Sequence, residues 1–311
     1  MKVGIIQMAV SADKQTNLDR ASQHIRDAAG RGADLVILGE MFCCPYENAA
    51  FTANAETREG PSTACLSRAA RENGVYLVGG SIPLLEDGRL YNASFVFDRS
   101  GRVIAVHRKV HLFDIDVEGG QYFKESDTFT AGNEVTLFDT EFGKMGLCIC
   151  FDFRFPELAR IMALEGARCI FVPAAFNMTT GPAHWELMFR QRAVDNQLFT
   201  VGAAPARSYE GYVSYANSMA VSPWGEVLYR AGEAPEAAVV VRVIWLTALS
   251  VSAKALISSQ LPSGSANSCP KRPGVKGDLS FISEITGAIS LVSIRLFSRF
   301  QIAFPILPRA V

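Results

Sequence analysis

The feature that most constrains the fold is a regular alternation of apolar strand patterns with helical patterns over the first three quarters of this 311-residue chain. Short apolar runs bounded by polar or turn residues predict strands, and apolar residues at helical spacing predict helices. We expect strands near residues 3–8, 35–38, 76–79, 94–97, 103–107, 146–149, 170–172 and 199–203, and helices near 17–29, 61–73, 156–165 and 183–196. This alternation is typical of a layered α/β domain.

Three reactive side chains stand where predicted strands end. Glu40 follows one apolar run, Lys109 closes a second, and Cys150 closes a third. Because ligands of α/β sheets collect beyond the carboxyl ends of strands, we expect a shared site there. A thiol needs a base, and a carbonyl under attack needs a positive charge near its oxygen. An acid, an ammonium and a cysteine therefore form a minimal set for cleaving an amide.

The cysteines differ in their surroundings. Cys150 lies between a strand pattern and a helical pattern, and such an elbow exposes the side chain near a helix N-terminus, which favours thiolate. Cys148 lies inside the strand pattern and is expected to be a packed structural residue. Cys43 and Cys44 form no Cys-x-x-Cys pair and have no histidine at ligand spacing, so we expect no metal site.

Three segments carry a specific resemblance. LGEMF at 38–42, RKVHLFD at 108–114 and CICFDFRFPE at 148–157 resemble, in order, the signature blocks of the nitrilase superfamily of carbon–nitrogen hydrolases. The similarity runs from residue 1 to about residue 240. It implies a four-layer αββα sandwich, no cofactor, and a homodimer that pairs through the face around residues 155–163.

The same resemblance implies roles for single residues. Cys150 would be the nucleophile, Glu40 the general base, and Lys109 the oxyanion partner together with the Phe151 N–H. Glu125 would be a second glutamate that positions the substrate and the catalytic groups. Amide attack would then give a thioester that water hydrolyses to the acid.

Within the superfamily the chain most resembles the ω-amidases, through HLFDIDV at 111–117, FKES at 123–126 and AFNMTTGPAHWEL at 175–187. Those enzymes release ammonia from ω-amides of dicarboxylates such as 2-oxoglutaramate and 2-oxosuccinamate. A distant carboxylate needs a fixed cation, and Arg154 is the candidate. The resemblance also places Tyr46, Phe176 and Thr180 in the substrate pocket. A structural salt bridge from Arg154, for example to Glu157, is an equally good interpretation of the sequence.

Other polar residues receive plainer interpretations. His184, beside Trp185, suggests a Cys–His dyad, yet a lone histidine next to an aromatic residue is more often a satisfied core group. Asp114 and Asp116 are expected to be turn or hydrogen-bonding residues.

Composition excludes several classes of function. The chain has a net charge of −1, is 49% hydrophobic and shows no basic patch before residue 240, so nucleic-acid and membrane binding have no support. Seven cysteines without paired spacing favour a reducing compartment. The apolar run at residues 2–10 is too short for a signal peptide, so we expect the cytoplasm, with mitochondria also compatible.

The pattern changes at the C-terminal end, which divides the chain into a hydrolase domain at 1–243 and an atypical tail at 244–311. The tail has two acidic residues against seven Lys or Arg, and twelve Ser. Local pattern and global fold disagree there, which favours a reading-frame or splice artefact. A divergent structural element and a partner or membrane contact are the other interpretations.

Two classes of function remain. The first is an active ω-amidase-like hydrolase, with deaminated-glutathione amidase as the nearest enzymatic alternative. The second is a catalytically impaired relative that acts as a binding or scaffold protein.

Overall fold

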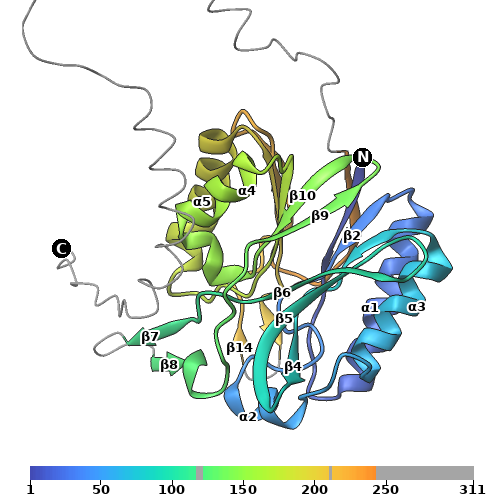
Figure 1. Cartoon of the computed structure of the whole chain (residues 1–311), viewed down its shortest axis with the longest axis vertical. Coiled ribbons are helices and arrows are strands. Elements are labelled where there is room, and N and C mark those ends of the chain that lie inside the picture. Colours follow the sequence, from blue (N-terminus) through green and yellow to red (C-terminus); the bar gives the residue numbers. More distant parts are fainter. Residues whose placement is uncertain (117–121, 210–211, 243–311) are drawn as a thin grey trace, which may run out of the picture. The chain divides into compact units, whose positions relative to one another are not determined.

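A computed structural model of the chain describes residues 1–116, 122–209 and 212–242 (Figure 1). The atypical tail predicted at 244–311 lies outside the described residues. The described helices and 3₁₀ turns are α1 (Lys14–Gly30), α2 (Asn48–Ala53), α3 (Pro61–Asn73), η1 (Glu125–Asp127), η2 (Cys150–Arg154), α4 (Pro156–Leu164) and α5 (Gly181–Asn196). The described strands are β1 (Lys2–Gln7), β2 (Leu35–Ile37), β3 (Tyr76–Val78), β4 (Ile82–Glu86), β5 (Arg89–Phe97), β6 (Val103–Arg108), β7 (Asp114–Asp116), β8 (Tyr122–Lys124), β9 (Thr136–Thr140), β10 (Gly143–Leu147), β11 (Cys169–Pro173), β12 (Phe199–Ala203), β13 (Ser208–Tyr209), β14 (Tyr212–Val213), β15 (Met219–Val221), β16 (Val227–Arg230) and β17 (Glu236–Arg242).

Two large sheets lie between two pairs of helices. The first sheet has the order β17-β1-β2-β3-β5-β4, with β6 also paired to β5, and the second has the order β16-β15-β12-β11-β10-β9. Helices α1 and α3 lie on the outer side of the first sheet, and α4 and α5 lie on the outer side of the second (Figure 1). The predicted four-layer αββα sandwich is confirmed.

The central strands of each sheet run parallel to one another. Strand β2 runs parallel to β1 and β3, and β11 runs parallel to β10 and β12. Because parallel strands end at the same edge of their sheet, the residues that follow β2, β10 and β11 are brought near one another. The backbone N–H of Glu40, after β2, donates to the carbonyl of Ala174, after β11, which joins the two sheets at this edge.

Small residues bring the helices close to the sheets. A Cβ at Gly4 of β1 would lie 2.8 Å from the Cβ of Ala28 in α1. A Cβ at Gly202 of β12 would lie 2.4 Å from the ring of Phe189 and 3.0 Å from that of Trp185, both in α5. Side chains larger than glycine at these positions would push the outer helices away from the apolar cores beneath them.

The predicted helices and strands are all present, and most of them differ from the prediction at their ends. Helix α3 and strand β12 have the predicted bounds, and the other predicted elements differ by a few residues at their ends. The prediction lacked α2, β4, β7 to β9 and the strands after β12. The hairpin of β4 and β5 turns at Asp87 and Gly88, which have φ of 50° and 69°. An Asp-Gly pair is a strong hairpin signal, so this turn was available from the sequence.

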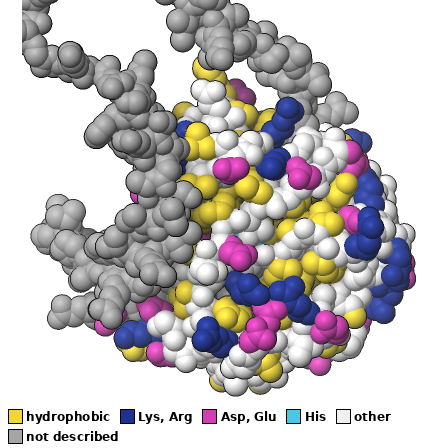
Figure 2. Space-filling model, viewed as in Figure 1, with side chains coloured by type: hydrophobic (Ala, Val, Ile, Leu, Met, Phe, Trp, Pro, Cys, Tyr) yellow, Lys and Arg dark blue, Asp and Glu magenta, His cyan; other side chains and the backbone are white. Residues whose placement is uncertain are grey.

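The surface agrees with the balanced composition. Figure 2 shows Lys and Arg side chains interspersed with Asp and Glu over the face in view. Of the helices in the described ranges, none combines the length and the apolar character that crossing a membrane requires.

Candidate active site

The structure brings four predicted residues together where strands of both sheets end. Glu40 follows β2, Lys109 directly follows β6, and Cys150 follows β10. Glu125 opens the η1 turn after β8. All four side chains are buried, with Lys109 and Glu125 fully inaccessible to solvent. Local sequence therefore places each residue at an element end, and the αββα arrangement makes these ends meet.

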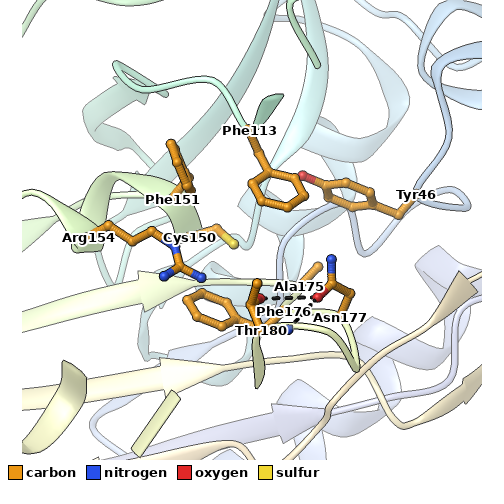
Figure 3. Close-up of a pocket in the computed structure, with 9 residues that line it drawn as sticks. All are labelled: Tyr46, Phe113, Cys150, Phe151, Arg154, Ala175, Phe176, Asn177 and Thr180. Atoms are coloured by element: carbon orange, nitrogen blue, oxygen red, sulfur yellow. Dashed lines mark hydrogen bonds between the residues drawn. The ribbon is translucent and has the colours of Figure 1, made fainter. Parts of the chain in front are cut away.

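A small pocket opens beside the Cys150 thiol (Figure 3). It encloses about 240 Å³ of space, including the part open to solvent. It is lined by Tyr46, Phe113, Cys150, Phe151, Arg154, Ala175, Phe176, Asn177 and Thr180. All four predicted substrate-binding residues thus line the same pocket as the predicted nucleophile. Cys148 is buried and is absent from this lining.

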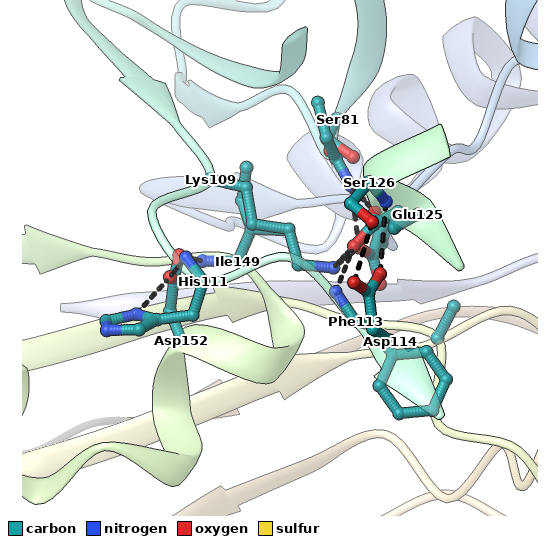
Figure 4. A network of polar contacts seen from close by, with 12 residues as sticks. Ser81, Lys109, His111, Phe113, Asp114, Glu125, Ser126, Ile149 and Asp152 are labelled. Carbon is teal, nitrogen blue, oxygen red and sulfur yellow. Dashed lines mark hydrogen bonds and ion pairs between the residues drawn. The ribbon is translucent and has the colours of Figure 1, made fainter. Parts of the chain in front are cut away.

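Lys109 is held between the two glutamates, and Figure 4 shows its side chain reaching toward Glu125. Its Nζ lies 2.8 Å from Oε1 of Glu40 and 2.8 Å from Oε2 of Glu125. The backbone N–H of Phe113 donates to Oε2 of Glu125 at 2.6 Å, which fixes this second carboxylate. An ammonium has three N–H donors, so two are used here and one remains for another acceptor.

Asn92 is a member of this cluster that the sequence prediction missed. Its Nδ2 donates to Oε1 of Glu40 and to Oε1 of Glu125, at 2.8 Å in each case. The Tyr46 hydroxyl lies 3.3 Å from Oε1 of Glu40 and 3.2 Å from Oε1 of Glu125. The signal for Asn92 was a polar residue inside the apolar strand β5, where burial requires a hydrogen-bond partner.

Burial and the mixed charges set the protonation states. The two carboxylates raise the pKa of Lys109 against the opposing effect of burial, so Lys109 is a cation and cannot act as a base. Burial raises the pKa of Glu40, while Lys109 lowers it. Burial also raises the pKa of the Cys150 thiol, and the Glu40 carboxylate raises it further. The resting cysteine is therefore a neutral thiol.

This result corrects the expectation of a thiolate at a helix N-terminus. Strand β10 ends at Leu147, and Cys150 begins the η2 turn, so α4 starts only at Pro156. Cys150 has a φ of 46°, in the left-handed region that few residues other than glycine adopt. The predicted elbow is present, but its strained residue, Cys150, begins a 3₁₀ turn and not an α-helix. Burial outweighs any effect of a helix dipole on the pKa of the thiol.

Asp152 joins the Lys109 segment to the Cys150 elbow and was also missed. Its Oδ1 accepts from the backbone N–H groups of Val110 and His111 and from Nδ1 of His111, at 3.1, 2.8 and 2.9 Å. Its Oδ2 accepts from Nε2 of His107 at 2.9 Å and from the Ile149 N–H at 3.0 Å. These bonds hold the pKa of Asp152 far below its usual range, despite complete burial.

Arg154 makes a contact that the sequence did not predict. Its guanidinium lies 5.5 Å from the ring centre of Phe151 and 5.1 Å from that of Phe176, and its Nη1 lies 2.9 Å from Nδ1 of His184. Within residues 1–116, 122–209 and 212–242 no carboxylate pairs with Arg154, so the salt bridge to Glu157 is wrong. His184 is half-buried and bonded to Arg154, so neither the dyad nor the packed-core interpretation describes it.

Comparison with known proteins agrees with this geometry. The carbon–nitrogen hydrolase family model matches residues 2–246. The chain belongs to the carbon–nitrogen hydrolase family. It is 49% identical over 232 residues to the ω-amidase NIT2-A of Xenopus laevis, a match that covers 74% of this chain and 84% of that protein.

Solved structures of this hydrolase family have the same fold. Nit3 of Saccharomyces cerevisiae, a member of branch 10 of the nitrilase superfamily, has a TM-score of 0.71 at 39% identity and covers 78% of this chain and 88% of its own. An amidase from Nesterenkonia sp. has a TM-score of 0.66 at 26% identity, covering 78% and 89%. In a variant of that amidase, the acetamide moiety of fluoroacetamide is covalently added at the active-site cysteine.

Two further expectations from the sequence concern metal ligands and the role of Asp114. In the described part of the chain, no cluster of three or more His, Cys, Asp or Glu residues is arranged to hold a metal ion. Asp114 accepts from the backbone N–H and the hydroxyl of Ser126, at 3.1 and 2.7 Å, which confirms its predicted hydrogen-bonding role.

Proposed function

We propose that this carbon–nitrogen hydrolase is an ω-amidase-like enzyme. It hydrolyses the ω-amides of dicarboxylates, such as 2-oxoglutaramate and 2-oxosuccinamate, to the dicarboxylate and ammonia. Cys150 carries the acyl group as a thioester between the two half-reactions.

The observation that carries this proposal is the state of Arg154. Its guanidinium lines the pocket beside Cys150 and pairs with no carboxylate of the described residues. Its Nε–H is buried and has no hydrogen-bond partner there. Burial lowers the pKa of Arg154, because its charge is poorly solvated. A substrate carboxylate is the ligand that would satisfy both the charge and the free N–H.

The first step is proton transfer from Cys150 to Glu40 as the sulfur attacks the amide carbon. Oε1 of Glu40 already accepts from Lys109 and Asn92, whereas Oε2 is buried and receives no hydrogen bond in the described structure. This second oxygen is the free site for the thiol proton. Because the thiol is neutral at rest, attack and proton transfer occur together rather than from a preformed thiolate.

The tetrahedral oxyanion then needs donors. Lys109 keeps one N–H after binding its two glutamates, and the backbone N–H of Phe151 lies next to the nucleophile in the η2 turn. We assign the oxyanion to these two groups. Glu125 and Glu40 both hold the Lys109 ammonium in place, each at 2.8 Å.

Collapse of this intermediate breaks the carbon–nitrogen bond. Glu40 returns its proton to the departing nitrogen, which leaves as ammonia, and the acyl group stays on Cys150. Water then attacks the thioester and gives a proton to Glu40, which passes it to the departing sulfur, so that the carboxylic acid and the free thiol are released. One water is consumed and one ammonia is produced.

The pocket also bears on the alternative substrate, deaminated glutathione. This larger amide would need room around Tyr46 and Phe176. Tyr46 is packed against Phe51 and Tyr212, with ring centres 5.2 Å away in both cases, and Phe176 lies 5.0 Å from Trp185. These packed aromatic walls favour the smaller dicarboxylate amides.

The test compares ammonia release from 2-oxoglutaramate, succinamate, deaminated glutathione and a neutral amide of the same length as succinamate. We expect the two ω-amido acids to have the highest kcat/KM. Arg154→Gln should raise their KM about tenfold to a hundredfold more than that of the neutral amide, because a charge-assisted pair is lost.

The matched control is Arg160→Gln, the same change on the exposed side of α4. It should leave the ratio of the KM values unchanged. Equal effects of Arg154→Gln on charged and neutral amides would refute the assigned substrate class.

We also propose that the enzyme is a homodimer that pairs through α4 and the adjoining α5. Leu164 of α4 is 67% exposed, and Leu187 and Val194 of α5 are 61% and 50% exposed, which is unusual for an unpartnered helical face. Leu187→Glu should halve the mass found by sedimentation if this face pairs.

The six cysteines of the described residues are all free, which fits a cytoplasmic or mitochondrial enzyme.

A further inference from the structure

We infer that His184 determines substrate specificity by positioning Arg154 for the substrate's carboxylate, which lies at the other end of the molecule from the amide. This inference rests on the proposed function. His184 is absent from the pocket lining, so it would act through Arg154 rather than by touching the substrate.

The direction of the hydrogen bond follows from the chemistry of the two side chains. A guanidinium has five N–H donors and no acceptor. The bond of 2.9 Å between Nη1 of Arg154 and Nδ1 of His184 therefore requires a lone pair on Nδ1. The imidazole is neutral and carries its proton on Nε2. Burial and the Arg154 charge lower the pKa of His184, which agrees with this assignment.

This bond selects which edge of the guanidinium is free. His184 takes a donor of Nη1, while the Nε–H of Arg154 has no acceptor in the described part of the chain. Nε and Nη2 together form a fork that matches a carboxylate in a bidentate arrangement. The rings of Phe151 and Phe176 lie on the guanidinium as cation–π partners and limit its tilt. The remaining freedom is rotation in its own plane, which the bond to His184 restrains.

His184 is itself fixed by helix α5, which begins directly after Thr180, a residue of the pocket lining. It lies in the first turn of α5, and its backbone N–H donates to the carbonyl of Thr180 at 2.9 Å. Thr180 lines the pocket, and its own hydroxyl and N–H donate to Oδ1 of Asn177, another lining residue. The start of α5 thus couples the pocket wall to the orientation of Arg154 on η2.

The test measures KM for succinamate and for the neutral amide of equal length in wild type, His184→Leu and His184→Asn. His184→Leu removes the acceptor and keeps an apolar side chain, whereas the Oδ1 of asparagine can replace Nδ1. We expect His184→Leu to raise the ratio of KM for succinamate to KM for the neutral amide by about threefold to tenfold. His184→Asn should restore most of the wild-type ratio.

A double variant separates positioning from general disturbance of the pocket. In the Arg154→Gln background, His184→Leu should have no further effect on the ratio, because the group it positions is gone. An unchanged ratio in His184→Leu, or full additivity in the double variant, would overturn the inference while the proposed function stands. A wild-type enzyme without preference for succinamate would refute the proposed substrate class and this inference together.

Discussion

Replacing Asp152 by asparagine tests whether one buried carboxylate holds the two halves of the catalytic site together. Asp152 accepts five hydrogen bonds, from the Lys109 segment on one side and from Ile149 and His107 on the other. In Figure 4 its cluster lies on one side of Lys109, and the Glu125 cluster lies on the other. Asparagine keeps the size of the side chain but turns one of its two acceptors into a donor.

The cost can be worked out from the partners. If the amide oxygen takes the place of Oδ1, the bonds from Val110 and His111 survive with a neutral acceptor. His107 can change tautomer, accept from the new NH₂ group and donate to the Thr136 hydroxyl, which lies 2.8 Å from its Nδ1. The Ile149 N–H is then left unpaired. One buried unpaired N–H and three weakened bonds, offset by removal of a buried charge, should lower the free energy of unfolding by about 2–5 kcal/mol.

Asp98 supplies the matched control. It also accepts several bonds, from Ser100 and Arg102, and its pKa is lowered to about 2. Its Arg102 partner is 81% exposed, so water can replace what Asp98→Asn removes. We expect this control to cost less than about 1 kcal/mol.

The assay is urea unfolding at neutral pH, with kcat for succinamate measured on the same samples. Because the pKa of Asp152 is depressed in the folded state, its contribution is present above the unfolded value of about 4 and is lost as pH falls toward the folded value. The difference between wild type and Asp152→Asn should therefore be full at pH 7 and shrink below about pH 4. Equal unfolding free energies and kcat for Asp152→Asn and Asp98→Asn would refute the reasoning.

Three further predictions concern the reacting groups. Cys150→Ala should abolish ammonia release and leave the urea midpoint close to wild type, since little packing volume is lost; residual turnover comparable to wild type would exclude the thioester route. Glu40→Gln and Lys109→Met should each lower kcat at least about a hundredfold, because this is the scale of a lost general base or oxyanion donor. A near-normal kcat in steady-state kinetics of either variant would show that its role is misassigned. Because Glu40 must be ionised to accept the thiol proton and its pKa is raised, the acid limb of kcat/KM should lie above the model carboxyl value of 4.5; a limb at or below that value would contradict the base assignment.

The sequence was sufficient to predict the position of those site residues that follow the end of a strand. Glu40, Lys109 and Cys150 each follow an apolar run, and the αββα fold makes such ends converge, so a one-dimensional pattern was sufficient to place them. Glu125 also lies near the edge of an apolar run, but its role as a second glutamate came only from the family resemblance.

The supporting contacts could not be predicted, because they join positions that no local pattern connects. Asn92 lies 52 residues from Glu40 and 33 from Glu125, yet it bonds both. Arg154 and His184 lie 30 residues apart on different elements. The thiolate expectation failed for a related reason: the sequence showed the elbow, but only the folded surroundings show how strongly burial acts on the thiol.

The charges of the buried cluster explain why the site can hold two carboxylates and one ammonium. With Cys150 neutral, Glu40 and Glu125 carry two negative charges against the single positive charge of Lys109. Burial is the main cause of the raised pKa of Cys150, and the Glu40 carboxylate raises it further, because a thiolate would add a third negative charge. In the proposed mechanism, the thiol proton neutralises Glu40 as the sulfur attacks, and the negative charge reappears on the oxyanion. Lys109 contacts Glu40 and, in this mechanism, would also contact the oxyanion, so it would exchange one anionic partner for another while the net charge of the cluster stays constant. If Glu40 and Lys109 act as proposed, this site stabilises the transition state without ever holding a free thiolate.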